Sequence, residues 1–354
     1  MSAFRIPTDL PESDGTLAWS STTLVAVHAS AGDCTGLGYT YADLATARLI
    51  DTLLARTVSG LDAMDVPAAW SAMVGAIRNL GRPGIASMAI AAVDNALWDL
   101  KARLLDVPLV SLLGRARDAI PVYGSGGFTS YSDGQLRDQL HDWAQHGIGM
   151  VKMKVGREPE RDVGRVRLAR DAIGPNVRLF VDANGAYTRK QALRFAVAFA
   201  QSGVTWFEEP VSSDDLEGLR LLRDRAPAGM DVAAGEYGYD LAYFRRMLDA
   251  GAVDVLQADA TRCAGISEFI RVGALCQAGN IGLSAHTAPN LHAHACCALG
   301  SAVHAEWFHD HERIERMLFD GALEVESGML RPDLSRPGMG LELRRADADR
   351  YAVA

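Results

Sequence analysis

The chain of 354 residues is long enough to bury a large core and to hold one large domain with a smaller companion. Its formal net charge of −9, with no offsetting basic run, argues against nucleic acid as a partner. No apolar stretch has the length of a membrane span, and Met1–Ser13 lacks the apolar core of a signal peptide. Five scattered cysteines, without metal-ligand spacing, predict reduced thiols in a cytoplasmic protein.

Residues 1–118 form the first predicted unit, an α+β domain. Two antiparallel strands are expected over Thr22–His28 and Thr35–Thr40. Three helices are expected to follow, near Tyr41–Thr57, Pro67–Leu80 and Gly84–Leu105. The last carries apolar residues around most of its circumference, which indicates burial between two bodies. Its acids Asp94 and Asp99 are interpreted as surface groups that pair with basic residues of the same helix.

Residues 119–318 form the second predicted unit, in which short apolar runs alternate with amphipathic helices. Eight strands are expected, at Ile120–Tyr123, Val151–Val155, Val177–Val181, Val204–Phe207, Asp231–Ala234, Val253–Gln257, Ile281–Ala285 and Val303–Trp307. This alternation is typical of a parallel β/α barrel. An open doubly wound sheet is the rival fold, but no Gly-rich dinucleotide turn follows the first strand.

Local signals set further boundaries. Ser132 and Thr188 are expected to cap helices, and Ser212 or Ser213 to begin another. The glycine-rich stretch 124–127 is interpreted as a loop. Residues 319–354 return to turns and short strands and are expected to pack on the first unit; the strands expected there are Leu323–Glu326 and Gly340–Arg344.

Three consecutive strands deliver acidic residues to their carboxyl ends: Asp182, Glu208 and Glu236. A single acid after a strand is more often a helix cap or a surface residue. In a barrel, however, these strand ends meet at one rim, where three carboxylates repel one another unless a cation lies among them. Oxygen-only ligands favour Mg²⁺, with Mn²⁺ as a substitute.

Lys152 and Lys154 alternate with apolar residues on the second barrel strand, so they share one face. Taken alone, the pattern favours a solvated edge strand with snorkelling lysines. If the strand is buried, acidic partners must neutralise both ammonium groups. Their mutual repulsion is expected to lower the pKa of each amine and to make Lys154 a usable base near neutral pH.

His286 ends the seventh barrel strand and Asp259 the sixth, so the two are expected to pair, which fixes the tautomer of the ring and raises its basicity. An isolated histidine would instead be a buried, hydrogen-bonded group. Glu306 adds an acid at the end of the eighth strand.

The remaining histidines near this rim are given structural interpretations. His292 and His294 are interpreted as packing or surface residues. The run Phe308-His309-Asp310-His311 could suggest a second metal site, but no matching ligand pair is visible, so a loop or capping cluster is favoured.

A cation between lysines on one side of a barrel mouth and a histidine on the other suits removal of the proton α to a carboxylate, because the enolate needs electrostatic stabilisation. The chain resembles the enolase superfamily, specifically its mandelate racemase subgroup, over nearly its whole length. The resemblance rests on Lys152-Met153-Lys154, Asp182-Ala183-Asn184, Glu208-Glu209-Pro210, Gly235-Glu236, Asp259, His286 and the helical run Ala96–Lys101. The chain departs from that pattern at Ala258, where proline is frequent, and at Cys263-Ala264-Gly265, where a glycine pair is frequent.

The resemblance implies a modified TIM barrel of (β/α)7β type with an α+β capping domain, formed by the N-terminal region and the C-terminal segment. It implies one Mg²⁺ per subunit, held by Asp182, Glu208 and Glu236. The superfamily is known to use a lysine or histidine base with Mg²⁺. A symmetric homo-oligomer is also implied.

The same resemblance implies roles for the other rim residues. Lys154 would act as base on one face of the substrate, with Lys152 assisting and contacting its carboxylate. His286, paired with Asp259, would act as acid or base on the other face. The remaining assignments are Glu306 to the enolate oxygen, Asn184 to substrate or metal-bound groups, Glu209 to a supporting position, and Trp19, in a closing loop at Asp14–Ser21, to substrate contact.

The function expected from these features is dehydration of a sugar acid, an aldonate or aldarate, to a 2-keto-3-deoxy acid. Racemisation or epimerisation of a 2-hydroxy acid is the alternative, since the same residues serve both. A sugar-phosphate barrel enzyme is disfavoured because residues 286–290 lack a Gly-rich phosphate grip. A non-catalytic binding scaffold is disfavoured because so many charged rim groups would be idle.

Overall fold

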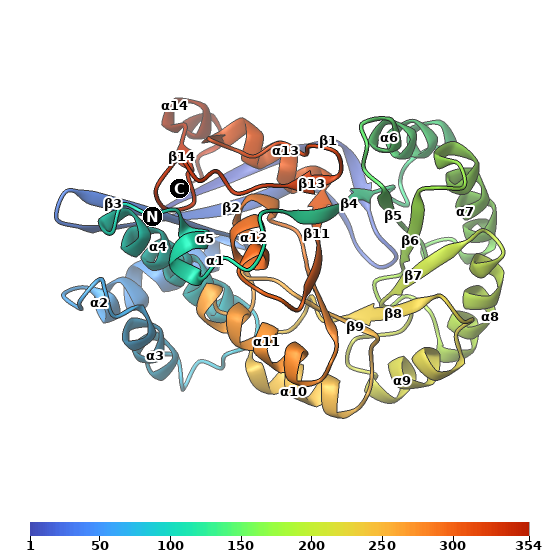
Figure 1. Ribbon diagram of the computed structural model, residues 1–354, viewed down its shortest axis with the longest axis horizontal. Coiled ribbons are helices and arrows are strands. Elements are labelled where there is room, and N and C mark those ends of the chain that lie inside the picture. Colours follow the sequence, from blue (N-terminus) through green and yellow to red (C-terminus); the bar gives the residue numbers. More distant parts are fainter. Residues whose placement is uncertain (354) are drawn as a thin grey trace.

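A closed barrel of eight parallel strands forms the larger part of the computed structural model, which describes residues 1–353 (Figure 1). The strands are β4 (Ile120–Gly126), β5 (Met150–Lys154), β6 (Arg178–Asp182), β7 (Val204–Glu208), β8 (Asp231–Ala234), β9 (Val255–Ala258), β10 (Gly282–Ala285) and β11 (Ala302–Phe308). Each strand pairs with the next in the chain, and β11 pairs with β4 to close the cylinder. The eight predicted strands are therefore confirmed, and their carboxyl ends share one rim.

Helices follow the strands on the outside of the barrel (Figure 1). They are α6 (Asp133–Gln145), α7 (Pro159–Ile173), α8 (Arg189–Ala200), α9 (Leu216–Arg225), α10 (Leu241–Asp249), α11 (Ile266–Ala278), α12 (Pro289–Cys297) and α13 (His309–Leu318). Ser132 and Thr188 cap α6 and α8 with full capping boxes, as predicted. The prediction of Ser212 or Ser213 as the start of α9 is wrong, because the Asp215 side chain accepts the hydrogen bond of Gly218 N and caps the helix.

The predicted loop at residues 124–127 is also wrong in part, because β4 continues through Gly126. A side chain at Gly124 would meet the Trp143 ring at 2.6 Å, and one at Gly126 would meet Gln139 Oε1 at 2.6 Å. These glycines are needed for the close packing of α6 on the strand, not for a turn.

A smaller body, called the cap below, covers the barrel rim. It contains the antiparallel sheet β1 (Ser2–Ser13), β2 (Ala18–Ala31) and β3 (Cys34–Tyr41), with helices α1 (Leu44–Leu49), α2 (Ala55–Val58), α3 (Val66–Ala76), α4 (Ile85–Leu104) and α5 (Leu109–Leu113). A π-helical turn, Ile50–Leu54, joins α1 to α2. Helix α4 lies directly on β3, where a side chain at Gly36 or Gly38 would collide with the α4 backbone, and it is buried as predicted.

The acids of α4 are buried, so their interpretation as surface groups is wrong, whereas the predicted pairing with a basic residue of the same helix is confirmed for Asp99 and Arg103. Asp94 is fully buried and accepts hydrogen bonds from Ser267 N and Ser267 Oγ of α11. Asp99 is also buried; it pairs with Arg103, but accepts as well from Leu37 N and Met339 N. Both carboxylates tie α4 to other segments.

The C-terminal segment lies partly against the cap, as predicted, and partly against the barrel, where Met329–Leu330 pairs antiparallel with β4. The two chain ends are side by side in Figure 1. It contains β12 (Phe319–Asp320), β13 (Met329–Leu330), β14 (Glu342–Leu343), α14 (Arg345–Ala348) and a 3₁₀ turn, Asp349–Tyr351. The predicted strand Leu323–Glu326 is wrong, since only Glu326 makes an isolated bridge, to Met329. Near the end, Val353 N donates to Ala3 O and Ala352 bridges Phe4 of β1.

The five cysteines are all free thiols. Among residues 1–353, no helix combines the length and apolar character needed to cross a membrane.

Candidate active site

Three buried carboxylates converge at the barrel rim. Asp182 ends β6, Glu208 ends β7, and Glu236 follows β8 after Gly235. One oxygen from each lies within 4.8 Å of the others. Gly235 has φ +138°, and a side chain there would lie 2.1 Å from Gln257 O, so only glycine lets Glu236 reach this position.

The charges of these groups indicate a cation site. Burial, followed by repulsion from Asp182, raises the pKa of Glu208 to about 8, and burial with Glu236 raises that of the adjacent Glu209. Glu236 Oε2 and Glu209 Oε1 are buried without hydrogen-bond partners in the part of the chain that the structure describes. An oxygen-only donor set with surplus negative charge and unused lone pairs fits a divalent cation such as Mg²⁺.

Lys152 and Lys154 share a face of β5, as predicted, and both are buried. Lys152 Nζ lies 2.6 Å from Glu208 Oε1, 2.9 Å from Glu306 Oε1 and 3.5 Å from Asp182 Oδ2. Lys154 Nζ pairs with Asp182 Oδ2. The solvated edge strand is therefore wrong, because acidic partners surround both lysines.

The expected lowering of the lysine pKa values is also wrong for this structure. Burial opposes the charged form of Lys154, and Lys152 repels it, but Asp182, Glu236 and Glu208 outweigh both and raise its pKa. The carboxylates likewise raise the pKa of Lys152 well above its ordinary value. Lys154 can therefore give up its proton only when the negative charge of these carboxylates is offset.

His286 and Asp259 form the predicted pair, with 2.9 Å between Nδ1 and Oδ2. Burial opposes ionisation of Asp259, but the hydrogen bond and charge of His286 outweigh it and lower the pKa of the carboxyl. His286 Nε2 faces the rim, 3.4 Å from Glu236 Oε2. A histidine held in this way presents one defined nitrogen to a bound molecule.

His292 holds the backbone next to this pair in place through hydrogen bonds. It is fully buried, its Nε2 accepts from Ala260 N, and its Nδ1 lies 2.7 Å from Thr287 O. It therefore joins the segment after Asp259 to the segment after His286. Its interpretation as a packing residue is confirmed, and that as a surface residue is wrong for both His292 and the equally buried His294.

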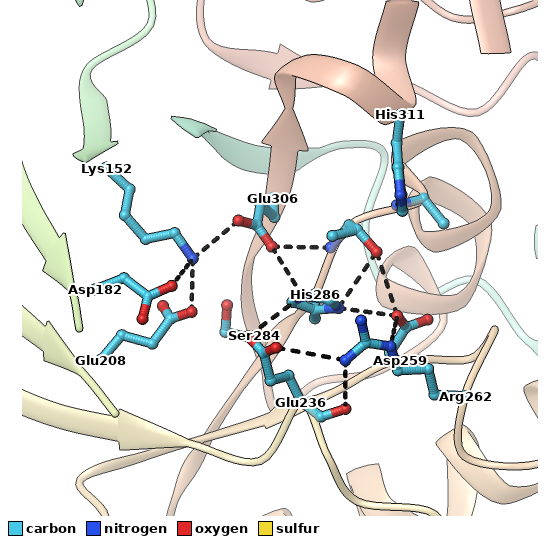
Figure 2. A network of polar contacts seen from close by, with 12 residues as sticks. Lys152, Asp182, Glu208, Glu236, Asp259, Arg262, Ser284, His286, Glu306 and His311 are labelled. Carbon is cyan, nitrogen blue, oxygen red and sulfur yellow. Dashed lines mark hydrogen bonds and ion pairs between the residues drawn. The ribbon is translucent and has the colours of Figure 1, made fainter. Parts of the chain in front are cut away.

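Glu306 lies between the two sides of the site (Figure 2). Its Oε1 contacts Lys152, while its Oε2 accepts from Thr287 N at 3.0 Å and lies 4.0 Å from His286 Nε2. One carboxylate thus connects the lysine side and the histidine side of the mouth.

A cavity of about 400 Å³ opens above these groups, between barrel and cap. Its lining includes Asp14, Trp19, Tyr41, Lys154, Asn184, Glu236, Tyr237, Arg262, His286, Glu306 and His311. The predicted loop Asp14–Ser21 is wrong in part, because β2 begins at Ala18 and contains Trp19. Trp19 Nε1 donates to Glu12 Oε2 at 2.7 Å. The loop between β1 and β2 rests on the barrel, since a side chain at Gly15 would meet Ala183 O at 2.4 Å. Lys152, in contrast, lies deeper and does not line the cavity.

Three cavity residues were missed by sequence reasoning. Arg262 Nη1 lies 3.4 Å from Glu236 Oε1, and its Nε lies 3.7 Å from Asp259 Oδ2. His311 is buried on α13 and stacks on Tyr41 of the cap, while Tyr237 directly follows Glu236. Arg262 lies three residues after Asp259, and Tyr237 directly follows Glu236, so both could have been predicted as neighbours of the rim. No sequence pattern indicated that His311 of α13 faces the cap.

The backbone is constrained where the strands deliver these side chains. Non-glycine residues with positive φ follow Asp182, Glu208 and His286 closely: Asn184 (46°), Glu209 (37°), Thr287 (50°) and Ala288 (39°). Such conformations cost about 1–3 kcal/mol each and concentrate at functional sites. Asn184 is buried, and its Oδ1 has no hydrogen-bond partner among the described residues.

The chain combines a closed parallel barrel with a cap to which the C-terminal segment contributes. Its carboxylate cluster lies between two lysines and a His–Asp pair. These features together define a Mg²⁺-dependent enzyme of the enolase type. The chain belongs to the mandelate racemase/muconate lactonizing enzyme group of the enolase superfamily. Residues 5–114 match the mandelate racemase/muconate lactonizing enzyme N-terminal domain, and residues 135–348 match the enolase C-terminal domain-like family.

Three relatives illustrate the similarity. A mandelate racemase/muconate lactonizing enzyme-like protein from Rubrobacter xylanophilus is 57% identical, with a TM-score of 0.98 over 99% of this chain and 98% of that one. A 3,6-anhydro-alpha-L-galactonate cycloisomerase from Streptomyces coelicolor is 34% identical over 99% of this chain and 97% of its own. L-Talarate dehydratase from Polaromonas sp. JS666, solved with Mg and L-glucarate, is 30% identical, with a TM-score of 0.89 over 100% and 96% of the two chains.

Proposed function

We propose that the protein removes the proton α to the carboxylate of a sugar acid and eliminates the β-hydroxyl, so that an aldonate or aldarate becomes a 2-keto-3-deoxy acid. The observation that carries the proposal is the placement of Lys154 and His286 in one cavity, with a carboxylate cluster that fits Mg²⁺ between them. The relative solved with L-glucarate supports a sugar acid as the substrate class.

In this proposal Asp182, Glu208 and Glu236 would hold a divalent cation, which would supply positive charge to stabilise the enolate. Lys154 Nζ or His286 Nε2 takes the α proton. His286 then donates a proton to the departing β-hydroxyl, which leaves as water, and the resulting enol tautomerises to the 2-keto acid. Lys152, which binds Glu208 and Glu306, keeps these carboxylates in position.

The cavity residues also support roles in binding. Trp19 lines the cavity from the cap and Asn184 lines it from the barrel. We propose that both residues contact the substrate. Glu306 lies between Lys152 and His286. We propose that its carboxylate accepts a hydrogen bond from the enol O–H, the protonated enolate oxygen of the intermediate.

The test is a screen of aldonic and aldaric acids with Mg²⁺, read by mass spectrometry and by a carbonyl reagent. Dehydration predicts loss of one water and a new keto acid. If no acid reacts while the protein binds metal, the proposal is wrong.

Racemisation or epimerisation of a 2-hydroxy acid is the second candidate, because Lys154 and His286 can address opposite faces of one carbon. In D₂O it predicts that a solvent deuteron replaces the α proton, so that the product is one mass unit heavier than the substrate. An isomer of the same mass with a changed ring structure would instead indicate cycloisomerisation, the activity named for the Streptomyces relative.

We further propose that the chain divides into a cap of residues 1–118, a barrel of residues 119–318 and a returning segment of residues 319–354. We propose a homo-oligomer in solution, which light scattering on the purified protein would test. A single monomeric species at micromolar concentration would contradict this.

A further inference from the structure

A second group of possible metal ligands lies outside the rim, where the cap meets α13. Asp9 and Glu12 come from β1, and His309 is the first residue of α13. Ligand atoms from the three lie within 4.8 Å of one another, and His309 Nε2 lies 3.1 Å from Asp9 Oδ2. The sequence next to His309 offers no matching ligand pair. In the folded chain Asp9 and Glu12, about 300 residues earlier, lie beside it instead.

An irregularity of β1 brings the two acids to this place. The five steps from Pro7 to Glu12 lie opposite only two steps of β2, from Ser21 to Trp19. The extra residues bulge out of the sheet ladder, and a bulge of this kind redirects side chains. Without it, Asp9 and Glu12 would lie farther apart along a regular strand.

Glu12 supplies an independent indication of a ligand. Glu12 is 1% exposed, and its Oε2 accepts from Trp19, yet its Oε1 has no hydrogen-bond partner among residues 1–353. A buried carboxylate oxygen without a partner is costly unless something binds it. Asp9, Asp310 and Arg313 are charged groups near Glu12, and together with an ionised Glu12 they carry a net charge of −2.

We propose that Asp9, Glu12 and His309 form a second divalent-metal site, distinct from the rim cluster, which takes a transition metal such as Zn²⁺ in preference to Mg²⁺. One imidazole with two carboxylates is a donor set that Zn²⁺ accepts, whereas Mg²⁺ favours oxygen ligands alone. Two ligands on Zn²⁺ lie about 3.4 Å apart for bonds of about 2.1 Å in tetrahedral geometry. The 3.1 Å between His309 Nε2 and Asp9 Oδ2 is close to that separation.

Such an ion would fasten the cap to the barrel beside the active cavity. It would hold Glu12, which accepts the indole hydrogen bond of Trp19, and Trp19 lines the cavity. The site would therefore be structural, with Trp19 as the link to substrate. It does not depend on which acid the enzyme converts.

The test is zinc binding to the full chain in excess Mg²⁺, which occupies the rim cluster. Metal-stripped protein is dialysed against micromolar Zn²⁺, and bound zinc is measured by elemental analysis, with unfolding temperature as a second readout. The wild type is expected to retain one Zn²⁺ per chain and to melt at a higher temperature with zinc. His309→Gln and Asp9→Asn are expected to weaken binding at least tenfold and to lose the shift.

His146→Gln is the matched control, because His146 also lies on the surface beside an aspartate, Asp142, but has no third ligand. It is expected to bind zinc as the wild type does. Equal zinc retention in the wild type and His309→Gln would overturn the proposal, as would loss of zinc only in Glu236→Gln, which would place the zinc at the rim. Asp9 is partly exposed, so Asp9→Asn should fold even if a change at buried Glu12 does not.

Discussion

Two lysines on one face of β5 have different surroundings, and their substitution should have different effects. Lys152 is enclosed by three carboxylates, whereas Lys154 contacts Asp182 and reaches the cavity. Removal of one partner from a buried ionic group leaves the others uncompensated. Removal of a proton-transfer group instead slows chemistry.

Lys154→Met is expected to lower turnover by about 10²–10⁴-fold while the protein still folds and binds Mg²⁺. Lys152→Met is expected to lower the free energy of unfolding by about 3–5 kcal/mol, because Glu208 and Glu306 lose their shared cation. Turnover on an acid found in the screen and denaturant unfolding in Mg²⁺ measure the two effects. The reverse pattern would contradict the distinction.

Asp94 shows how one buried carboxyl couples stability to pH. Burial, against the hydrogen bonds from Ser267, raises its pKa to about 7, whereas an unfolded aspartate has a pKa of about 3.9. The folded state therefore binds the proton more tightly. The stability linked to this group is present below about pH 4 and is lost as pH rises toward 7.

The variant Asp94→Asn does not titrate and keeps acceptor and donor atoms for Ser267. Between pH 5 and pH 8, its free energy of unfolding is expected to gain roughly 2–3 kcal/mol relative to the wild type. Urea unfolding at several pH values measures the difference. A constant difference across that range would show that Asp94 is already ionised at pH 5.

At the scale of elements, the ends of the barrel strands determine where the metal ligands lie. Glu236 is carried by a short segment after β8 whose geometry depends on Gly235. The β9 backbone stands against that glycine, so a methyl group has no room there. A substitution at Gly235, which has no side chain to bind the metal, should therefore still alter metal binding.

Gly235→Ala is expected to displace Glu236 and to weaken Mg²⁺ binding at least tenfold, as measured by calorimetry. Gly149→Ala is the control, since it has a negative φ and open space around its Cα. It should bind Mg²⁺ like the wild type. Equal affinity in both variants would mean that β9 yields to the methyl group.

At the scale of the whole molecule, the carboxylate cluster links the stability of the fold to metal binding. Three buried acids repel one another when no cation is present, and a bound cation removes that repulsion. A ligand at about 100 times its dissociation constant adds about 2.7 kcal/mol to stability.

Mg²⁺ is therefore expected to raise the unfolding temperature of the wild type, and EDTA to lower it. Glu236→Gln has one acid fewer, so it should be at least as stable as the wild type in EDTA and should gain little from Mg²⁺. Differential scanning calorimetry of both proteins, with and without metal, tests this. A Mg²⁺ shift of equal size in the variant would argue against Glu236 as a ligand.

The barrel strands could be predicted because both faces of a parallel barrel strand are covered, which leaves apolar runs in the sequence. The rim acids followed from the position of those runs. Sequence did not predict the sign of the Lys154 pKa shift, because that depends on carboxylates from β6, β7 and β8 at once. Nor could it place Asp94 or His311, because Ser267, the partner of Asp94, lies 173 residues away and Tyr41, the partner of His311, lies in the cap.

The departure at Cys263-Ala264-Gly265 has a local consequence. Ala264 is buried with φ +65°, a conformation in which glycine is less strained, and its carbonyl accepts from Trp70 Nε1 of the cap. The chain therefore retains a strained alanine at a cap–barrel contact.

The bridge between Phe4 and Ala352 has a consequence for how the protein is made. The first strand is synthesised early, but its pairing with the returning segment awaits residues made more than three hundred positions later. Closing so long a loop is slow, and β1 is exposed to mispairing with other chains in the meantime. The cap residues that line the cavity, among them Trp19 and Tyr41, are made before the barrel, so only the C-terminal edge of the cap remains to be added at the end of synthesis.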